Sequence, residues 1–529
     1  MAQNQNAEPK DAVEVEDETV LIAARRRKLD FIRSEIGVEP YGHRVDGLSD
    51  LAAARAAFDE DAHQRFASDE GDDRPQVLVS GRVMQHRDIG KLVFLSLRDA
   101  TGDLQVSISR AECPPEQFRL AKKLDYGDVI VAGGAMGKTK RGEICIWANR
   151  IEMHAKSLVP PPEKFHGLAD PELRYRKRYM DMYANPETIQ TMQARANIIS
   201  EIRRFMDGRS FLEVETPMLH PMAGGAAAKP FHTQHNALDM PLFMRIAPEL
   251  YLKRLLVGGL PRVYEINRNF RNEGIDRSHN PEFTAMEVYQ AFGDCWSMLE
   301  LTESLMWELA CTRGEEARSR GEEVGGTADA PVLPFGELQI DYRRPFERVT
   351  FGELFERGCG FPMDDFAAVR AKARELGITK EATMDDWFVV NEVFEECAEP
   401  LIDPTRPTFV TDYPSAISPL TRPHADNPAL AERWDLFIAG MEIGPSYTEL
   451  NDPDIQHAKF TEQLRGADED EQAFRSLDED FLESLRVGMP PAGGLGLGID
   501  RIVMLLTNSS SIRDVIAFPL MRPEGGRSE

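Results

Sequence analysis

The stretch that best indicates the fold of this chain is RVYEINRNFRNEGIDRSHNPEFTAMEVYQAF, residues 262–292, in which two β-strand patterns flank a polar loop. Alternate residues of the second strand share one face, and that face carries Phe283, Ala285, Glu287 and Tyr289. Burying a carboxylate beside aromatic rings is unfavourable unless a cation pairs with it. The pattern therefore predicts a cationic ligand or partner at Glu287.

The loop between these strands and the end of the first strand concentrate ionisable side chains. They supply Arg268, Arg271, Glu273, Arg277 and His279. Guanidinium groups match phosphate oxygens and stack on planar rings, so arginines beside an aromatic face favour a site for a base with phosphates. A structural network of ion pairs is the alternative interpretation.

A second informative stretch, GGLGLGIDRIVMLLT at residues 493–507, alternates glycine with leucine. Because Gly494, Gly496 and Gly498 have no side chains, another molecule can approach this strand closely. The spacing matches neither the GxGxxG dinucleotide loop nor the GxxxxGK[ST] phosphate loop. Arg501 follows at the start of an apolar helix, which favours a nucleotide platform.

Between these two stretches, DLFIAGMEIGPSYTELND at residues 435–452 predicts a β-hairpin. If residues 439–440 form the turn, Glu442 lies opposite Phe437 and diagonal to Asp435. Two carboxylates placed in this way favour one or two hard cations, and Mg²⁺ bridging triphosphate oxygens is the natural candidate. A surface pair of carboxylates is the alternative.

Upstream, residues 196–219 predict a packing unit with no chemistry of its own. An amphipathic helix ends at Gly208, and a strand from Phe211 to Thr216 is halted by Pro217. We expect this unit to be buried in the core or at a dimer interface.

The chain divides into regions that differ in their sequence patterns. Five short alternating runs within residues 77–158, separated by Gly and Asp turns, predict a small β-barrel, either an OB-fold or another barrel. We expect a helical and flexible extension over 1–75, the barrel over 76–158, a linker over 159–185 and an α+β domain over 186–529 with a helical insertion at about 345–405. The basic run at residues 25–28 predicts an exposed helix, either solvated or in contact with a polyanion.

Composition narrows the class of protein. Among 529 residues, 62 Lys and Arg stand against 89 Asp and Glu, a formal net charge of −27 that opposes general adhesion to nucleic acid but allows a local basic groove. The 6 cysteines form no CxxC pair, which predicts reduced thiols and no zinc site. The apolar runs are too short for a membrane span and the N-terminus lacks a secretory signal, so we expect a cytoplasmic protein.

These segments, in this order, resemble the class II lysyl-tRNA synthetases of bacterial type, members of class IIb of the aminoacyl-tRNA synthetases. FLEVETPML (residues 211–219) is similar to class II motif 1, RNFRNEGIDRSHNPEFTAMEVY (268–289) to motif 2 and GLGLGIDR (494–501) to motif 3. The runs that resemble the lysine enzymes in particular are GGAAAKPF (224–231), RIAPELYLKRLLVGG (245–259), SYTELNDP (446–453) and SIRDVIAFP (511–519).

The resemblance covers about residues 77–523 and implies an architecture and an activity. It implies an α+β fold with an antiparallel class II sheet and helices, preceded by an OB-fold that reads the anticodon, in a homodimer. The implied reaction is ATP-dependent activation of L-lysine to lysyl-adenylate, with Mg²⁺, followed by transfer to the 3′ end of tRNA(Lys).

The resemblance also implies roles for individual residues. Arg271 and Arg501 are the implied catalytic residues, with Arg271 on the α-phosphate and Phe283 and Arg501 around the adenine. The ATP site is implied to comprise Arg271, Glu273, His279, Phe283, Glu442, Gly498 and Arg501. The lysine site is implied to comprise Gly224, Glu249, Glu287, Tyr289, Tyr447 and Glu449. The implied Mg²⁺ ligands are Asp435 and Glu442, and the implied anticodon contacts are Arg82, Phe94 and Gln105.

Two positions depart from the family pattern. The family commonly has asparagine where this chain has Pro445, and glutamate where it has Asp435, so we expect altered lysine affinity and a shifted magnesium position.

Two other functions fit parts of the sequence. One is a paralogue that lysylates a protein, although such relatives lack the barrel; the other is a non-catalytic tRNA-binding module, which would have no reason to keep Arg271, Glu442 and Arg501.

Overall fold

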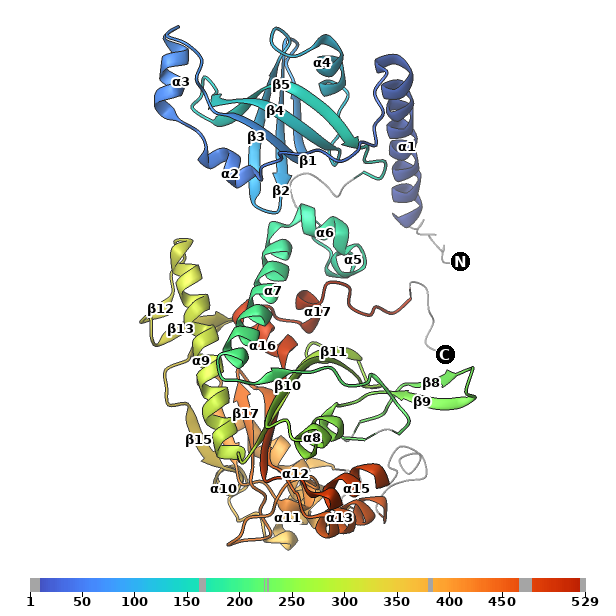
Figure 1. Ribbon diagram of the computed structural model, residues 1–529, viewed down its shortest axis with the longest axis vertical. Coiled ribbons are helices and arrows are strands. Elements are labelled where there is room, and N and C mark those ends of the chain that lie inside the picture. The colour runs from blue at the N-terminus through green and yellow to red at the C-terminus, as the bar shows by residue number, and fades with distance from the viewer. Residues whose placement is uncertain are drawn as a thin grey trace, which may run out of the picture. The chain divides into compact units, whose positions relative to one another are not determined.

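The computed structural model describes residues 10–160, 168–222, 224–225, 228–378, 384–465 and 478–523. The chain divides into two units, residues 1–190 and 191–529, whose elements are labelled in Figure 1. Among the described helices, none has an apolar stretch long enough to cross a membrane.

The first unit is built on a closed five-stranded barrel with the strand order β1-β2-β3-β5-β4. Its strands are β1 (Gln76–Asp88), β2 (Leu92–Asp99), β3 (Gly102–Ser109), β4 (Val129–Lys138) and β5 (Ile144–Ala155). The β3–β5 pair is parallel and the other pairs are antiparallel. Alternate residues of β2 point into the barrel, as the period of two requires. This arrangement is an OB-fold and confirms the predicted barrel.

Seven described helices, one long and six short, belong to the first unit. They are α1 (Lys10–Phe31), η1 (Ile32–Ile36), α2 (Leu51–Ala56), α3 (Glu60–Ala67), α4 (Pro115–Ala121), α5 (Pro171–Arg176) and α6 (Arg178–Ala184). Ile32 and Ile36 of η1 and Leu51 of α2 join the hydrophobic core of the barrel. The start of the chain is therefore packed on the barrel at η1 and α2.

The second unit is built on an eight-stranded sheet with the order β15-β16-β17-β18-β19-β11-β10-β6. Its strands are β6 (Leu212–Glu213), β10 (Arg262–Phe270), β11 (Glu282–Ala291), β15 (Glu347–Thr350), β16 (Thr408–Thr411), β17 (Arg433–Ile438), β18 (Met441–Thr448) and β19 (Ala492–Gly498). The sheet is antiparallel from β16 to β10, as predicted, but its outermost pairs, β15–β16 and β6–β10, are parallel.

Helices and two small sheets complete this unit. The helices are α7 (Pro186–Asp207), which begins in the first unit, α8 (Glu249–Val257), α9 (Cys295–Ser319), α10 (Phe351–Cys359), α11 (Phe366–Leu376), α12 (Asp386–Cys397), η2 (Glu399–Leu401), η3 (Ser415–Ile417), α13 (Pro453–Arg465), α15 (Glu479–Gly488), α16 (Ile499–Leu506) and α17 (Ile512–Val515). The small sheets are β7 (Leu219–His220), β9 (Met240–Met244) and β8 (His232–His235), and β12 (Gly325–Gly326), β13 (Pro331–Phe335) and β14 (Leu338–Asp341).

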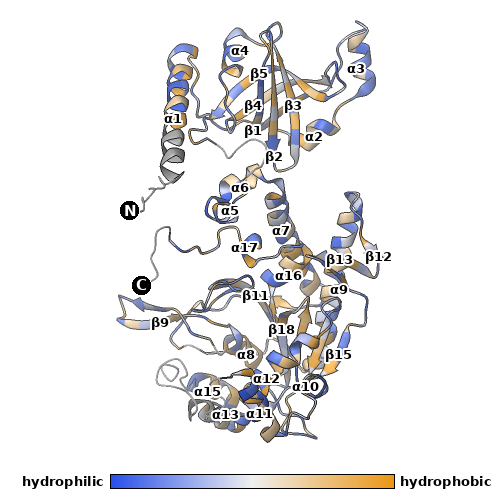
Figure 2. Cartoon of the chain, turned by 180° about the vertical axis from the view of Figure 1, so that it is seen from behind, coloured by the Kyte–Doolittle hydropathy of each residue, from blue (hydrophilic) through white to orange (hydrophobic). Residues whose placement is uncertain are grey.

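The main core lies where α7, α9 and α16 pack on the large sheet. Met286 and Val288, on one face of β11, join this core together with Ile502 and Val503 of α16. Hydrophobic colours accordingly cover much of α16 in Figure 2. The opposite face of β11 is left for the site described below.

Two details differ from the sequence expectations. The strand predicted from Phe211 to Thr216 is only Leu212–Glu213, because this edge strand pairs with β10 over two residues before the chain reaches Pro217, which cannot donate to a ladder. Residues 347–350, counted with the helical insertion, instead form β15 of the large sheet. The helices that follow, α10 to α12, have a hydrophobic core of their own.

Candidate active site

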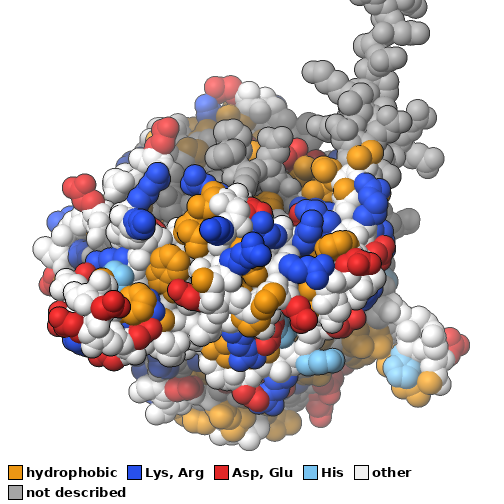
Figure 3. Space-filling view, turned by 90° about the horizontal axis from the view of Figure 1, so that it is seen from above, with side chains coloured by type: hydrophobic (Ala, Val, Ile, Leu, Met, Phe, Trp, Pro, Cys, Tyr) orange, Lys and Arg blue, Asp and Glu red, His pale blue; other side chains and the backbone are white. Residues whose placement is uncertain are grey.

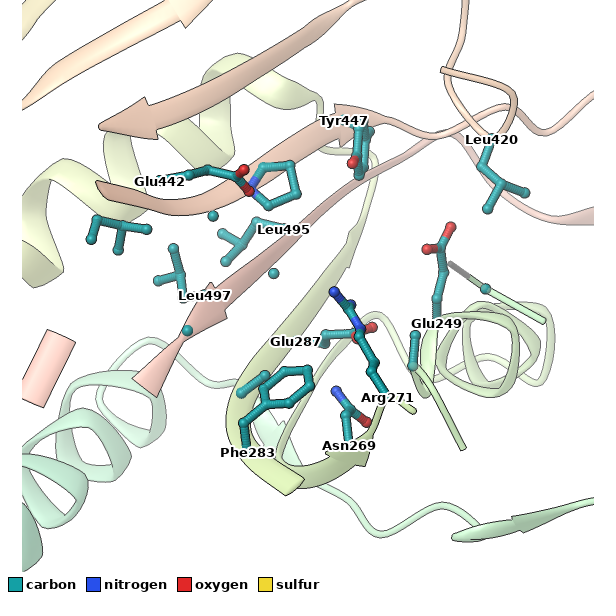
Figure 4. A pocket seen from close by; sticks show the side chains of 18 of the residues that line it. Glu249, Asn269, Arg271, Phe283, Glu287, Leu420, Glu442, Tyr447, Leu495 and Leu497 are labelled. Carbon is teal, nitrogen blue, oxygen red and sulfur yellow. The ribbon is translucent and has the colours of Figure 1, made fainter. Parts of the chain in front are cut away.

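A cavity of about 620 Å³ opens on the face of the sheet formed by β11, β18 and β19. The predicted site residues in its walls are Gly224, Glu249, Arg271, Glu273, His279, Phe283, Glu287, Tyr289, Glu442, Tyr447, Gly498 and Arg501. Asp435 and Glu449, also predicted for the site, do not line it. In Figure 4, Arg271, Phe283 and Glu287 extend from the β10–β11 hairpin toward the space that Glu442 and Tyr447 face from β18.

The glycine strand β19 serves two purposes. A Cβ atom on Gly494 would lie 2.0 Å from Glu449 Oε1 and 2.6 Å from the Tyr289 ring, so this glycine makes room for side chains of the protein itself. At Gly498 the nearest atom would be 3.6 Å away, and Gly498 and Gly496 both line the cavity. The sequence predicted that the whole glycine strand is open to a ligand. The structure leaves only its C-terminal end, at Gly496 and Gly498, open to the cavity.

Arg271 and Phe283 form one wall of the cavity. The guanidinium carbon of Arg271 lies 5.0 Å from the centre of the Phe283 ring. The Nε atom of Arg271 is buried and has no hydrogen-bond partner among the described residues. Since an unpaired buried donor is costly, this arginine is available to an anionic ligand.

Arg501 is held by a network that joins three elements. Its Nη1 donates to the main-chain oxygen of Glu442, and its Nη2 lies 3.0 Å from Nε2 of His279. The other ring nitrogen of His279, Nδ1, lies 2.8 Å from Asp276 Oδ2. Because a guanidinium can only donate, Nε2 accepts and the ring proton is on Nδ1. Although desolvation acts in the opposite direction, hydrogen bonds from Ser278 and His279 lower the pKa of Asp276 to about 2.

At the other end of the cavity, Glu287 is buried, and no cation among the described residues forms an ion pair with it, although the charge of Arg271 lowers its pKa slightly. Its side chain accepts a hydrogen bond of 3.2 Å from the Tyr289 hydroxyl, and the residue is 8% exposed. Burial raises the pKa of Glu287 to about 8, and the nearby Glu249 acts in the same direction. The pattern of β11 predicted a cationic ligand or partner here; the described residues supply no ion pair to Glu287, so a cationic ligand stays a prediction.

Glu449, by contrast, has a cation. The Lys253 ammonium lies 2.5 Å from Glu449 Oε2 and 2.7 Å from Glu249 Oε1, and the Lys253 and Glu449 side chains are fully buried. Burial alone would lower the pKa of Lys253, but Glu249 and Glu449 raise it. The structure therefore places Glu449 behind the cavity wall, in an internal ion pair.

Asp435 and Glu442 stand in the register that the hairpin predicted. The turn at residues 439–440 places Glu442 opposite Phe437, and Asp435 pairs with Pro445. Both oxygens of Asp435 accept hydrogen bonds from Arg433, at 2.9 and 2.7 Å. Glu442 instead faces the cavity, and its pKa is raised by desolvation and by Asp435.

The Glu442 carboxylate is better placed to bind a divalent cation than the Asp435 carboxylate, because Asp435 is already paired with Arg433. A carboxylate whose pKa is raised by a second carboxylate gains from a nearby positive charge. No cluster of three or more metal-binding side chains occurs in the part of the chain that the structure describes. One or two carboxylates together with substrate phosphates are nonetheless a common way to bind Mg²⁺.

In the first unit, the predicted anticodon residues lie on the barrel. Phe94 on β2 stands opposite Arg87 on β1 and Ser107 on β3, and Gln105 on β3 stands opposite Ser96 on β2. These side chains form rows on the outer face of the three strands. Arg82 is already engaged within the protein. Its Nη1 donates to Gly127 O at 2.6 Å, and its guanidinium carbon lies 4.5 Å from the centre of the Tyr183 ring.

Comparison with known proteins identifies the family. A family model described as tRNA synthetases class II (D, K and N) matches residues 170–522, and one described as an OB-fold nucleic acid binding domain matches residues 77–160. The chain belongs to the class II tRNA synthetases.

Curated relatives match almost the whole length. A protein named lysine–tRNA ligase from Carboxydothermus hydrogenoformans is 45% identical, covering 95% of this chain and 98% of the relative. A lysine–tRNA ligase from Pelotomaculum thermopropionicum is 44% identical, over 99% and 100%. The heat-inducible lysine–tRNA ligase of Escherichia coli is 43% identical, over 99% and 100%.

Three charged residues around the cavity of this class II synthetase were not among those predicted from the sequence. Lys253 follows Glu249 by four residues on α8, a spacing that brings side chains together, but its second partner, Glu449, is remote in sequence. Arg433 precedes Asp435 by two residues on one strand face, which could have indicated their pairing.

Glu399 comes from the helical insertion. Burial raises its pKa to about 7, and the carboxylates of Glu395, Glu442 and Asp435 act in the same direction. No sequence pattern pointed to Glu399.

Proposed function

We propose that this chain is a lysine–tRNA ligase, which activates L-lysine with ATP to lysyl-adenylate and transfers the lysyl group to the 3′ end of tRNA(Lys). One observation supports the choice of amino acid. Glu287 is a buried carboxyl group at one end of the cavity, and no cation of the described residues forms an ion pair with it, whereas Arg271 and Arg501 line the other end. A substrate that brings a side-chain ammonium supplies the missing charge.

We infer that the lysine ammonium binds between Glu287 and Tyr289. Glu249 and the backbone at Gly224, which line the same end, would receive the α-amino group, and Tyr447 would close the pocket from β18. Glu449 then acts through Lys253, because that ammonium holds both Glu449 and Glu249 in place. The Pro445 departure removes an amide from this wall, and the remaining polar contacts must orient the substrate.

We infer that ATP occupies the arginine end. The adenine would lie between the Phe283 ring and the Arg501 guanidinium, with Glu273 and His279 at its polar edge and phosphates, and with Gly498 leaving room at the strand. Arg271, whose Nε has no partner, would bind the α-phosphate. His279 and the Glu442 main chain orient Arg501 for this role.

The proposed chemistry is positioning and charge stabilisation. An oxygen of the lysine carboxylate attacks the α-phosphorus of ATP in line, pyrophosphate leaves, and Arg271 stabilises the charge that develops on the phosphoryl oxygens. A hydroxyl of the terminal tRNA adenosine then attacks the lysyl carbonyl and AMP leaves. No nucleophile from the protein is required. Glu442, with Asp435 beside it, would hold Mg²⁺, which when bound neutralises charge on the triphosphate.

We further propose that the barrel reads the anticodon. The Phe94 ring offers a stacking surface for an unstacked base, and the Gln105 amide offers hydrogen bonds. Arg82 would reach RNA only by leaving Tyr183 and Gly127, so we assign it to shaping the edge of this face. The homodimer and the cytoplasmic location expected from the resemblance are part of the same proposal.

Amino-acid-dependent ATP–pyrophosphate exchange tests this function. We expect exchange with lysine and none with arginine, ornithine, aspartate or asparagine, in the presence of Mg²⁺. Adding tRNA(Lys) should then give lysyl-tRNA, which identifies the acceptor. Absence of exchange with every amino acid would contradict the proposal and favour a non-catalytic tRNA-binding protein.

A further inference from the structure

Outside the cavity, two cysteines that are far apart in sequence lie next to each other in the second unit. Charged side chains of both signs mingle on the face of the molecule that Figure 3 shows. Cysteines are rare by comparison, since the sequence has 6, and all are free thiols. Cys359 at the end of α10 and Cys397 at the end of α12 are both partly exposed. A small reagent from solvent can therefore approach both residues.

The ends of α10 and α12 come close together beside these cysteines (Figure 1). A Cβ atom on Gly358 would lie 2.4 Å from the main-chain oxygen of Cys397 and 3.0 Å from the Cα atom of Ala398. Gly358 directly precedes Cys359, which packs against the hydrophobic core of the helical insertion together with Ala398. A disulfide requires Cβ atoms about 3.8 Å apart, so only segments that approach as closely as these can form one.

The two thiols and one lysine also influence one another electrostatically. Burial, together with the charge and a side-chain hydrogen bond of Cys397, raises the pKa of the Cys359 thiol to about 12. Lys372 acts in the opposite direction on Cys359, and both thiols in turn act on the Lys372 ammonium. Because Cys359 is held in its protonated form, the first thiolate of the pair forms on Cys397, beside a cation that favours it.

We propose that Cys359 and Cys397 are a peroxide-sensitive pair that closes reversibly into an intramolecular disulfide and so ties α10 to α12. Cysteines that respond to oxidants are typically accessible and lie beside a second thiol that resolves the first oxidation product. Cys359 and Cys397 meet both conditions. The proposal concerns the helical insertion and does not depend on which amino acid the cavity binds.

The chemistry takes two steps and consumes one peroxide. The Cys397 thiolate attacks an oxygen of hydrogen peroxide, the O–O bond breaks, and the released hydroxide takes up a proton, which leaves a sulfenic acid and water. The neutral sulfenic acid no longer opposes ionisation of Cys359, whose sulfur then attacks that of Cys397. The S–O bond breaks, the S–S bond forms and a second water leaves. The two sulfurs have then lost two electrons, which the peroxide has accepted.

Helix α12 connects this pair with the wall of the cavity. Phe388, near the other end of α12, lines the cavity, and so does Ile417 of η3, which packs against the same hydrophobic core as Cys359. Phe388 precedes Cys397 by nine residues, about 14 Å along a helix. A disulfide at Cys397 closes a loop of about 40 residues and restricts local unfolding of this segment. The oxidation state of the pair therefore sets how rigid this wall is.

Peroxide treatment of the full-length wild type tests the proposal directly. The reduced protein is exposed to a small excess of hydrogen peroxide, its remaining thiols are alkylated, and its peptides are identified by mass spectrometry. We expect two of the 6 thiols to disappear, a peptide pair joined through Cys359 and Cys397, and full recovery of both thiols with dithiothreitol. Amide hydrogen exchange across residues 386–397 should slow severalfold in the oxidised protein and stay unchanged in the barrel.

Single variants test the order of the two steps. In Cys359→Ser, Cys397 should form a sulfenic acid that persists and reacts with dimedone. In Cys397→Ser, Cys359 should react with peroxide at least about tenfold more slowly, because its thiolate is scarce. The matched control is Cys311→Ser, which removes a partly exposed thiol on α9 and should form the disulfide like the wild type.

Three results would overturn the proposal. One is loss of thiols in the wild type without a peptide joined through Cys359 and Cys397, and another is a loss that dithiothreitol does not reverse. Both measurements use the unmodified protein, so they do not depend on how well a variant folds. The third is an equal rate of oxidation in Cys359→Ser and Cys397→Ser, which would contradict the assignment of the first step to Cys397.

Discussion

The two ends of the cavity treat charge in opposite ways. At one end, Arg271 and Arg501 face the cavity, and no carboxylate of the described residues forms an ion pair with them. At the other, Glu287 is buried, and among the residues that the structure describes its hydrogen-bond partner is the Tyr289 hydroxyl. Each end thus offers side chains that can carry the charge its proposed ligand lacks, since phosphates are anionic and the lysine side chain is cationic.

The residues behind the walls differ from those in them. Asp435 accepts two hydrogen bonds from Arg433, and Glu449 pairs with Lys253, so these carboxylates are neutralised within the protein. Removing one partner of a buried ion pair leaves the other charge buried and destabilises the protein. A buried group without a partner in the protein can instead be paired by the charge of a ligand. Pairing therefore distinguishes Asp435 and Glu449 from Glu287, whereas Glu249 both pairs with Lys253 and lines the cavity, and the predictions below test these differences.

The largest effect should come from breaking an internal pair. Lys253→Met leaves Glu249 and Glu449 buried without their cation, and we expect the free energy of unfolding to fall by about 3–5 kcal/mol. Urea unfolding measures this loss. Adding Glu449→Gln to the variant should restore part of it. A single variant as stable as the wild type would show that the pair is not needed for folding.

Removing an unpaired cation should harm the reaction and spare the fold. Arg271→Ala is expected to slow lysyl-adenylate formation about 10²- to 10³-fold, because one charge-stabilising donor of the transition state is lost. ATP–pyrophosphate exchange measures the rate, and tRNA binding should not change. The matched control is Arg268→Ala, a β10 residue that pairs loosely with Glu282 outside the cavity walls. Equal losses in both variants would contradict the role of Arg271.

The division between paired and unpaired charges shows how far sequence reasoning reaches. The period of two on β11 correctly placed Phe283, Glu287 and Tyr289 on one face, and the turn at residues 439–440 correctly placed Glu442 opposite Phe437. These are local rules of strands and hairpins. They also yielded the five barrel strands, whereas the antiparallel middle of the large sheet was implied by the resemblance to class II synthetases.

What the sequence could not supply is which carboxylates are already neutralised. Glu287 and Glu449 look alike as buried acidic residues, yet only Glu449 meets Lys253, which approaches from α8. Such a pairing depends on how a helix packs on a strand nearly two hundred residues away. The same holds for Arg82, whose engagement with Tyr183 depends on the packing of α6.

Removing an unpaired anion should weaken lysine binding and leave the protein at least as stable as the wild type. Glu287→Gln keeps the shape of the side chain but removes the charge that the ammonium needs, so we expect the KM for lysine to rise about 30- to 100-fold, or about 2–3 kcal/mol. The KM for ATP should not change. Because burial disfavours the carboxylate, the variant should unfold no more easily than the wild type at pH 8. A destabilised variant with normal lysine affinity would reverse the assignment.

The pH dependence of lysine binding gives the smallest and most specific test. With the pKa of Glu287 raised to about 8, this carboxyl is protonated in the free protein at pH 7, and it must lose that proton to pair with an ammonium. The cost of deprotonation falls as pH rises, so lysine affinity should increase roughly tenfold from pH 6 to 7, less steeply from pH 7 to 8, and level off above pH 8. Calorimetry in buffers of different ionisation enthalpy should find close to one proton released per lysine at pH 7.

Two controls separate this effect from others. ATP affinity should lack this pH dependence, because the arginine end does not include Glu287. Glu287→Gln should remove the pH dependence from lysine binding. An affinity for lysine that is flat from pH 6 to 8 in the wild type would mean that Glu287 is ionised before the ligand arrives, and that a cation other than the substrate already pairs with it.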